Sequence, residues 1–167
     1  MLFRSRTEQQ IYEECVYQVG ALAALARAVA WPLTHLKPHG ALYNLACRSD
    51  DYARPVVAVA DLFGLPLLGL PGSPLEKLCQ RRVPFVAEGF ADRRYRPDGT
   101  LVPRDQSDAF VKDPGEAVRQ VEWLLRDRGV RSICVHGDNP QAVAFVRELR
   151  EALEHAGHRI QAILRSS

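Results

Sequence analysis

This sequence has few lysines, a small net charge and no long apolar runs. Only three of the 22 basic residues are lysines, and 20 acidic residues leave a net charge of +2 over 167 residues. Such an even balance gives no electrostatic reason to expect nucleic acid as a partner. No apolar run approaches the roughly 18 residues of a membrane-spanning helix, and residues 1–10 are polar and lack the apolar core of a secretory signal. The sequence therefore predicts a cytoplasmic protein that binds neither nucleic acid nor membranes.

Paired cysteine motifs are also missing. Cys15, Cys47, Cys79 and Cys134 are widely spaced and form no C-x-x-C pair. This spacing argues against a zinc knuckle or a thiol redox motif. We expect these residues to be buried thiols in a reducing cytosol.

The composition is that of an ordinary globular chain, with 47% hydrophobic and 25% charged residues. No repeat or low-complexity segment interrupts it, so residues 1–167 are predicted to form one domain. Helix-start patterns occur at Thr7 with Gln10, at Ser73 with Pro74 and Glu76, and at Asp113 with Pro114 and Glu116. Further helices are expected after Gly40 and over about residues 51–63 and 140–156. The first helix, about residues 7–30, should present one apolar face made of Ile11, Cys15, Val19, Leu22, Leu25 and Val29.

Short apolar runs predict strands between these helices. The expected strands are residues 33–37, 65–70, 84–88 and 130–135, with a final one at 158–164. Continuous apolar runs are typical of strands that are covered on both faces. Alternation of such strands with amphipathic helices predicts an α/β fold with a parallel sheet.

Polar side chains follow three of the predicted strands. Lys37 and His39 follow the first, Glu88 leads to Asp92 and Arg93, and a later strand runs into His136 and Asp138. The loops after parallel strands gather on one face of an α/β fold, and that face carries the chemistry. We therefore predict that Lys37, His39, Glu88, Asp92, His136 and Asp138 lie around one cleft.

The residues alone leave non-catalytic interpretations open at each segment. Lys37 could extend to the surface while His39 caps the following helix. Asp92 with Arg93 could be a surface ion pair, which contributes little to stability, and Arg104 could be an exposed loop residue. Asp138 or Asn139 could serve as a plain helix N-cap. His155 is explained by its place at a helix end, without a catalytic role. Gly89, by contrast, has a functional interpretation, because it would let the backbone approach a ligand closely.

Three ordered motifs together resemble the family of 5-oxoprolinase A subunits, also called LamB/YcsF. Residues 37–44, Lys-Pro-His-Gly-Ala-Leu-Tyr-Asn, are similar to its central signature. A second motif runs from Phe90-Ala91-Asp92-Arg93 through Tyr95 and Asp98-Gly99 to Arg104, and a third is Cys134-Val135-His136-Gly137-Asp138. Residues 17–22 also match a recurrent family helix. The resemblance spans nearly the whole chain.

The resemblance implies ATP-dependent hydrolysis of 5-oxoproline to glutamate by a (β/α) barrel-like fold of the glycoside hydrolase/deacetylase type. It implies partner subunits B and C, ATP as a substrate, and Mg²⁺ or another divalent metal. No ligand set for a metal is visible in the sequence. A homo-oligomer is a further expectation.

The family's site residues carry over to matching positions of this chain. Lys37 and Arg93 would hold anionic groups, and His39 or His136 would move protons. Asp92 and Asp138 would orient a histidine, activate water or bind metal. The resemblance also implies substrate or phosphate contacts, which would be made by Tyr43, Asn44, Glu88, Arg93 and Arg104.

The sequence departs from the family pattern in two places. We expect that the family's N-terminal portion rich in Asp, Glu, His and Gly is not included in residues 1–167, and that a connecting segment is missing between Arg128 and Ser132. A closed barrel takes about 250 residues, so we expect an incomplete barrel, poor stability or self-association, and little activity by the chain alone. Two alternatives remain: a metal-dependent amide or carbohydrate deacetylase-like hydrolase, with two histidines and an aspartate on the metal, or an inactive fragment that only binds partners.

Overall fold

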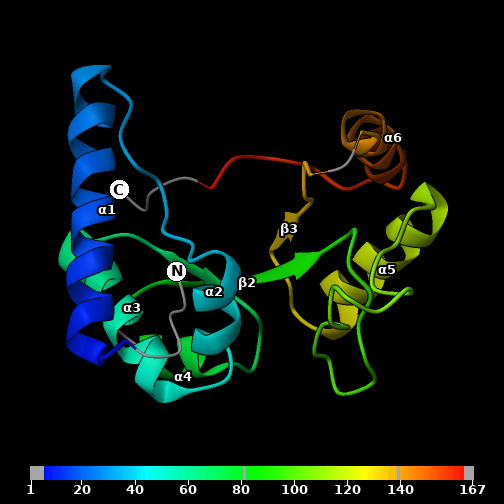
Figure 1. The fold of residues 1–167 in the computed structure, drawn as a ribbon. Helices are drawn as coiled ribbons and strands as arrows, with labels where there is room; N and C mark the ends of the chain where they lie inside the picture. The colour runs from blue at the N-terminus through cyan, green and yellow to red at the C-terminus, as the bar shows by residue number, and fades with distance from the viewer. Residues whose placement is uncertain (1–5, 81, 139, 164–167) are drawn as a thin grey trace. The chain divides into compact units, whose positions relative to one another are not determined.

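The computed structural model describes residues 6–80, 82–138 and 140–163, and its fold consists of two compact units (Figure 1). The first unit runs to Ala87 and includes Ile163, and the second is Glu88–Ala162. Each unit contains helices and one parallel strand pairing. The α/β class with parallel strands is therefore confirmed, whereas one domain over 1–167 and an incomplete barrel stay predictions.

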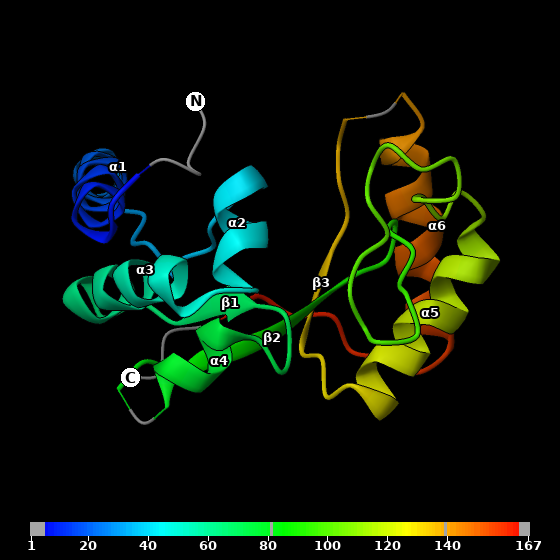
Figure 2. The same cartoon turned by 60° about the horizontal axis from the view of Figure 1, so that its bottom comes forward.

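The first unit is mainly helical. Its elements are α1 (Glu8–Ala28), α2 (Gly40–Ala46), α3 (Asp50–Phe63), β1 (Leu67–Gly69), α4 (Pro74–Cys79) and the first half of β2 (Phe85–Phe90). Helices α1 and α3 lie side by side in Figures 1 and 2. The core includes Ile11 from α1, Val56 and Ala60 from α3, Leu67 from β1 and Leu75 from α4.

The predicted start of α1 is confirmed, and its predicted apolar face is only partly buried. The side chain of Thr7 accepts from Gln10 N and the side chain of Gln10 accepts from Thr7 N, which completes the capping box. Ile11 is buried, but Leu22, Leu25 and Val29 are exposed. The helix is apolar on more than one side over residues 17–30, so helical periodicity did not identify which side packs on α3.

Two other helix starts follow the pattern that predicts them, with one difference. The side chain of Ser73 accepts from Glu76 N at the start of α4, and Asp113 accepts from Glu116 N at the start of the helix Pro114–Asp127, α5. The carboxylate of Glu76 accepts from Gly72 N rather than from Ser73 N. The expected reciprocal box at Ser73 is therefore replaced by a bond one residue earlier.

The second unit contains the second half of β2, α5 (Pro114–Asp127), β3 (Ser132–Cys134) and α6 (Ala142–His155). Helices α5 and α6 lie side by side (Figures 1 and 2). They enclose a core that includes Ala117, Val121, Leu149 and Leu153. This packing places the loops after β2 and β3 within the same unit.

Strand β2 takes part in both parallel pairings. Its first half pairs with β1, with Leu67 opposite Phe85, and its second half pairs with β3, with Phe90 opposite Cys134. The loop after β2 and the loop after β3 therefore leave the paired strands in the same direction. This register brings the second and third polar motifs close together.

Two predicted strands are wrong. Residues 33–37 contribute only one parallel bridge, between Leu36 and Leu67, in place of a strand. The described part of the predicted final strand, residues 158–163, lies outside any strand. Both segments are short, and an apolar run of this length does not by itself supply the partner that a strand needs.

The segment after β2 forms a small antiparallel arrangement. Tyr95 bridges Leu101, and the predicted turn at Pro97-Asp98-Gly99 lies between them. The Asp98 carboxylate accepts from both the backbone N–H and the hydroxyl of Thr100. Gly99 has φ of 82°, a left-handed conformation that suits glycine.

Position 89 has no room for a side chain, because α5 packs directly on β2 there. A Cβ at this position would lie 2.8 Å from Leu124 Cδ1 and 3.2 Å from Val130 Cγ1. The expected role of Gly89, close approach of a ligand to the backbone, is thus replaced by close approach of a helix.

Replacing Gly89 with alanine should lower the free energy of unfolding by about 1–3 kcal/mol, because the added methyl group overpacks the contact with Leu124. Urea unfolding followed by circular dichroism measures this loss. Gly137→Ala is the matched control, since a Cβ there has no neighbour within 4 Å. Equal stability of the two variants would contradict the packing explanation.

Candidate functional site

Asp92 and His136 form a hydrogen-bonded pair after neighbouring strands. Asp92 follows β2 and is 6% exposed, and His136 follows β3 with a side chain that is 24% exposed. Asp92 Oδ2 lies 2.9 Å from the backbone N and 2.9 Å from Nδ1 of His136. An ionised carboxylate only accepts hydrogen bonds, so Nδ1 carries the proton in the neutral imidazole. Nε2 is then the nitrogen that can take up a proton.

The imidazole is also held by an aromatic side chain. The ring of His136 stacks on that of Phe90, with centroids 5.5 Å apart and planes 9° from parallel. Phe90 is the last residue of β2 and is buried, so its ring is held by packing at the end of the strand. Together with Asp92, this contact fixes both the position and the plane of the imidazole.

Arg93 places a buried guanidinium next to this pair in the chain. It is 6% exposed, and Nη2 donates to Val102 O over 2.6 Å. Its guanidinium carbon lies 5.3 Å from the centroid of Phe110. Burial, and next repulsion from Arg104, lower the pKa of Arg93, while Asp92 and Asp138 act in the opposite direction. Buried positive charge of this kind favours an anion nearby.

Arg104 supplies a second guanidinium in the same unit. Its Nη1 lies 3.0 Å from Asp138 Oδ2, and its guanidinium carbon is 5.9 Å from the Phe110 ring centroid. Arg104 is the main reason that the pKa of Asp138 lies below its ordinary value. Both side chains are substantially exposed, so this pair contributes little to stability. Arg104 is therefore available to exchange Asp138 for an incoming anion.

These contacts resolve two positions for which the sequence leaves alternatives open. Instead of forming a surface ion pair with Asp92, Arg93 is buried against backbone carbonyls and Phe110. The N-cap of α6 is Gln141, without a side-chain cap bond, so Asp138 does not cap this helix. Asn139, the other candidate cap, lies outside the described residues.

Glu88 differs from its expected place. The sequence predicts that it ends a strand, but β2 continues through Gly89 to Phe90, and Glu88 is 2% exposed within it. The apolar run in the sequence ends before the strand does, because Glu88 and Gly89 interrupt the hydrophobic pattern without interrupting the pairing. A substrate contact by Glu88 stays a prediction.

The residues of the first motif belong to the other unit. The ammonium of Lys37 lies 5.9 Å from the ring centroid of Tyr43, which is buried in α2. His39 is the N-cap residue of α2 but makes no side-chain cap bond. Asn44 donates to Gly40 O over 2.9 Å within the same helix. Participation of Lys37, His39, Tyr43 and Asn44 in the site of Asp92 and His136 stays a prediction.

Two residues of the second unit were missed by sequence reasoning. Phe110 contacts both Arg93 and Arg104 but carries no signal in the sequence. Gln120 donates to backbone carbonyls beside Asp92. It lies on α5 three residues after Ala117 and four before Leu124, both buried. A polar residue on the apolar stripe of a helix was the signal that could have found it.

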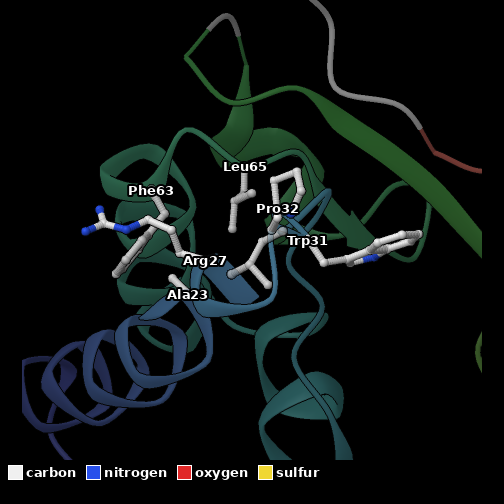
Figure 3. Close-up of a pocket in the computed structure, with 8 residues that line it drawn as sticks. Ala23, Arg27, Trp31, Pro32, Phe63 and Leu65 are labelled. Carbon is white, nitrogen blue, oxygen red and sulfur yellow. The ribbon is translucent and has the colours of Figure 1, made fainter. Parts of the chain in front are cut away.

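A separate cavity of about 330 Å³ lies in the first unit (Figure 3). The residues labelled in Figure 3 that line it are Ala23, Arg27, Trp31, Pro32, Phe63 and Leu65. Arg27 is the only charged residue in its lining, and none of the predicted site residues lines it. This hollow is thus distinct from the predicted chemistry.

The described residues form neither a group of metal ligands nor a membrane-spanning helix. Within residues 6–80, 82–138 and 140–163, no group of three or more His, Cys, Asp and Glu side chains is arranged to hold a metal ion. In the same part of the chain, no helix combines the length and apolarity needed to cross a bilayer.

The four cysteines include only one that is fully buried, Cys79. Burial, with a smaller contribution from the charge of Glu76, raises the pKa of the Cys79 thiol to about 12. Burial likewise raises the pKa of Cys15. The expectation of buried thiols therefore holds for Cys79, whereas Cys15, Cys47 and Cys134 are half-buried.

Known proteins share both the sequence and the fold. Proteins from Streptomyces griseus and Geobacillus kaustophilus, each named as the A subunit of 5-oxoprolinase, are 43% identical to this chain over 168 and 171 residues. Each match covers 92% of this chain, with 67% and 66% of the respective relative. The chain thus spans about two thirds of the length of these relatives.

A solved structure and a family profile agree with these relatives. The crystal structure of a lactam utilization protein from Thermus thermophilus superposes with a TM-score of 0.83 at 35% identity, covering 95% of this chain and 69% of that protein. The profile of the LamB/YcsF family matches residues 5–167. The chain therefore belongs to the LamB/YcsF family.

Proposed function

We propose that this chain is the A subunit of an ATP-dependent 5-oxoprolinase that hydrolyses 5-oxo-L-proline to L-glutamate. The observation that carries the proposal is the Asp92–His136 pair in the same unit as two arginines, Arg93 and Arg104. The relatives named as 5-oxoprolinase A subunits support the family role. A site for a lactam carboxylate and phosphate needs cations, and lactam opening needs a proton acceptor.

The reaction proceeds by activation of a stable amide. Transfer of the γ-phosphoryl group of ATP to the lactam oxygen forms an O–P bond, releases ADP and makes the ring carbon electrophilic. Water adds to that carbon, the C–N bond breaks, and the nitrogen takes a proton. A second water converts the resulting acyl phosphate to glutamate and phosphate.

His136 is the proposed general base for the attacking water. Its Nδ1 proton is held by Asp92, so its Nε2 accepts the proton from water. The imidazolium formed in this step is stabilised by the nearby carboxylate charge of Asp92. When the C–N bond breaks, the same nitrogen returns the proton to the leaving amine. A base oriented in this way is suited to both halves of the hydrolysis.

Arg93 and Arg104 are the proposed anion-binding residues. Arg93 is buried and already fixed by Val102 O and Phe110, so it offers a preorganised charge. Arg104 is exposed, and its pair with Asp138 is exchangeable. Guanidinium groups suit carboxylate and phosphate because they donate two parallel hydrogen bonds. Glu88, in the same unit, is proposed to contact the substrate as well, and substrate contacts by Lys37, Tyr43 and Asn44 stay predictions.

Partners and ATP belong to the same proposal. Subunits B and C would supply further walls of the site, and Mg²⁺ would arrive with the nucleotide. The exposed apolar side chains of Leu22, Leu25, Val29 and Trp31 favour self-association, which light scattering would detect as a mass above 18.7 kDa. We also propose that the protein is cytoplasmic.

Coupling between nucleotide and lactam hydrolysis tests this function. We expect ADP and glutamate in equal amounts when the chain, subunits B and C, ATP, Mg²⁺ and 5-oxoproline are combined. Omission of this chain should stop glutamate release. ADP production that is independent of 5-oxoproline would contradict the coupling.

No arrangement of described residues favours the deacetylase alternative, which needs two histidines and an aspartate on one metal.

A further inference from the structure

Gln120 donates to the backbone on both sides of Asp92. Its Nε2 lies 2.8 Å from Phe90 O, 3.3 Å from Ala91 O and 2.8 Å from Arg93 O. An amide group has two hydrogens, so the two short contacts take one each and the contact with Ala91 is shared. One side chain on α5 thus spans the segment that carries the aspartate.

The same segment is tied to the rest of the unit by backbone hydrogen bonds. Ala91 N donates to Cys134 O over 3.0 Å, and the carbonyl of Asp92 accepts from Val111 N over 3.1 Å. Gln120 adds the contacts from the α5 side. These bonds approach the segment from several directions, so the Asp92 carboxylate has little freedom to move relative to His136.

The hydrogen bonds of Gln120 explain why a partly buried amide is tolerated at this position of α5. Position 120 lies on the face of α5 that carries the buried residues Ala117 and Leu124. A partly buried amide is unfavourable unless its hydrogens are bonded. Backbone carbonyls beside Asp92 are the acceptors that satisfy it.

We propose that Gln120 is a positioning residue for the proton acceptor. It holds residues 90–93 so that the Asp92 carboxylate meets His136 Nδ1, which keeps the proton on Nδ1 and leaves Nε2 ready to accept one. The inference rests on the proposed function in one respect: it takes Asp92 and His136 to be the pair that moves the proton in the reaction. It assigns to α5 a role in the chemistry beyond packing.

The test replaces the amide with groups of nearly the same size that lack its donors. Gln120→Leu removes the amide, and Gln120→Glu faces the three carbonyls with a carboxylate. Nitrogen NMR of ¹⁵N-histidine-labelled full chain reports the tautomer of His136, whose signal among five histidines is assigned by its loss in His136→Ala. Arg119→Leu, an exposed neighbour on the same helix, is the matched control.

The wild-type chain and Arg119→Leu should show the Nδ1–H tautomer of neutral His136. Both Gln120 variants should show a mixture of the two tautomers while circular dichroism stays unchanged. In the assembly with subunits B and C, kcat should fall by about 10–100-fold with little change in KM, because a displacement of about 1 Å has effects of this size.

A pure Nδ1–H tautomer in either folded Gln120 variant would overturn the inference, as would an unchanged kcat. The tautomer measurement needs no turnover. If the wild-type assembly releases no glutamate, the proposed function fails while the positioning of His136 by Gln120 is still decided by the NMR result.

Discussion

Replacing Asp92 with asparagine should lower kcat for glutamate formation by about 10²–10⁴-fold, the range of a general base. The carboxylate now accepts from two donors, the backbone N and Nδ1 of His136. In asparagine an NH₂ group replaces one of the two oxygens, Oδ1 and Oδ2, that lie 3.1 and 2.9 Å from Nδ1. This NH₂ group instead favours an imidazole with the proton on Nε2, which is the nitrogen that must accept the proton from water.

The expected loss lies in kcat more than in KM, because the anion-binding residues are unchanged. Steady-state kinetics with varied 5-oxoproline in the complete assembly measures both parameters. His155→Ala is the matched control: its Nδ1 bonds Glu151 O at the end of α6, outside the site. An Asp92→Asn variant with wild-type kcat would show that the pair is structural.

Replacing Arg93 with methionine should lower the free energy of unfolding of the chain by about 2–5 kcal/mol. The guanidinium donates to Val102 O and Ala109 O, and its loss takes this donor from Val102 O at a cost of about 1–3 kcal/mol, whereas Ala109 O keeps its bond from Arg94 N. The contact with the Phe110 ring is also reduced. These bonds join residue 93 to the loop that carries Arg104.

Urea unfolding of the full chain measures this effect. Arg126→Met is the matched control, because Arg126 is exposed and pairs with its neighbour Asp127. We expect Arg93→Lys to keep part of the stability but to bind phosphate more weakly, since an ammonium lacks the two parallel donors. Equal stability of Arg93→Met and Arg126→Met would contradict the structural role of the buried arginine.

Local rules predicted the starts of helices well, since their signals are short-range. Thr7, Ser73 and Asp113 each accept a backbone hydrogen bond where the capping patterns place them. These interactions involve residues three positions apart, so the sequence contains both partners. The strand at 33–37 failed for the opposite reason: a strand depends on a distant partner, and only Leu36 obtains one.

The sequence predicted that Asp92 and His136 lie close together, but not the groups that hold them. The rule that loops after parallel strands converge placed Asp92 near His136, as the register of β2 and β3 requires. Phe110 and Gln120 were not recognised, because an aromatic or amide side chain without a motif looks like an ordinary packing residue. Gly89 shows the converse, since a glycine expected to face a ligand faces Leu124.

The most direct measurement is glutamate release from 5-oxoproline by this chain combined with subunits B and C, ATP and Mg²⁺. We predict turnover by the complete assembly and very slow or absent turnover by the chain alone. Lys37→Ala and His136→Ala should each abolish release while circular dichroism remains that of the wild type. Full release with either variant, or no release by the wild-type assembly, would contradict the account.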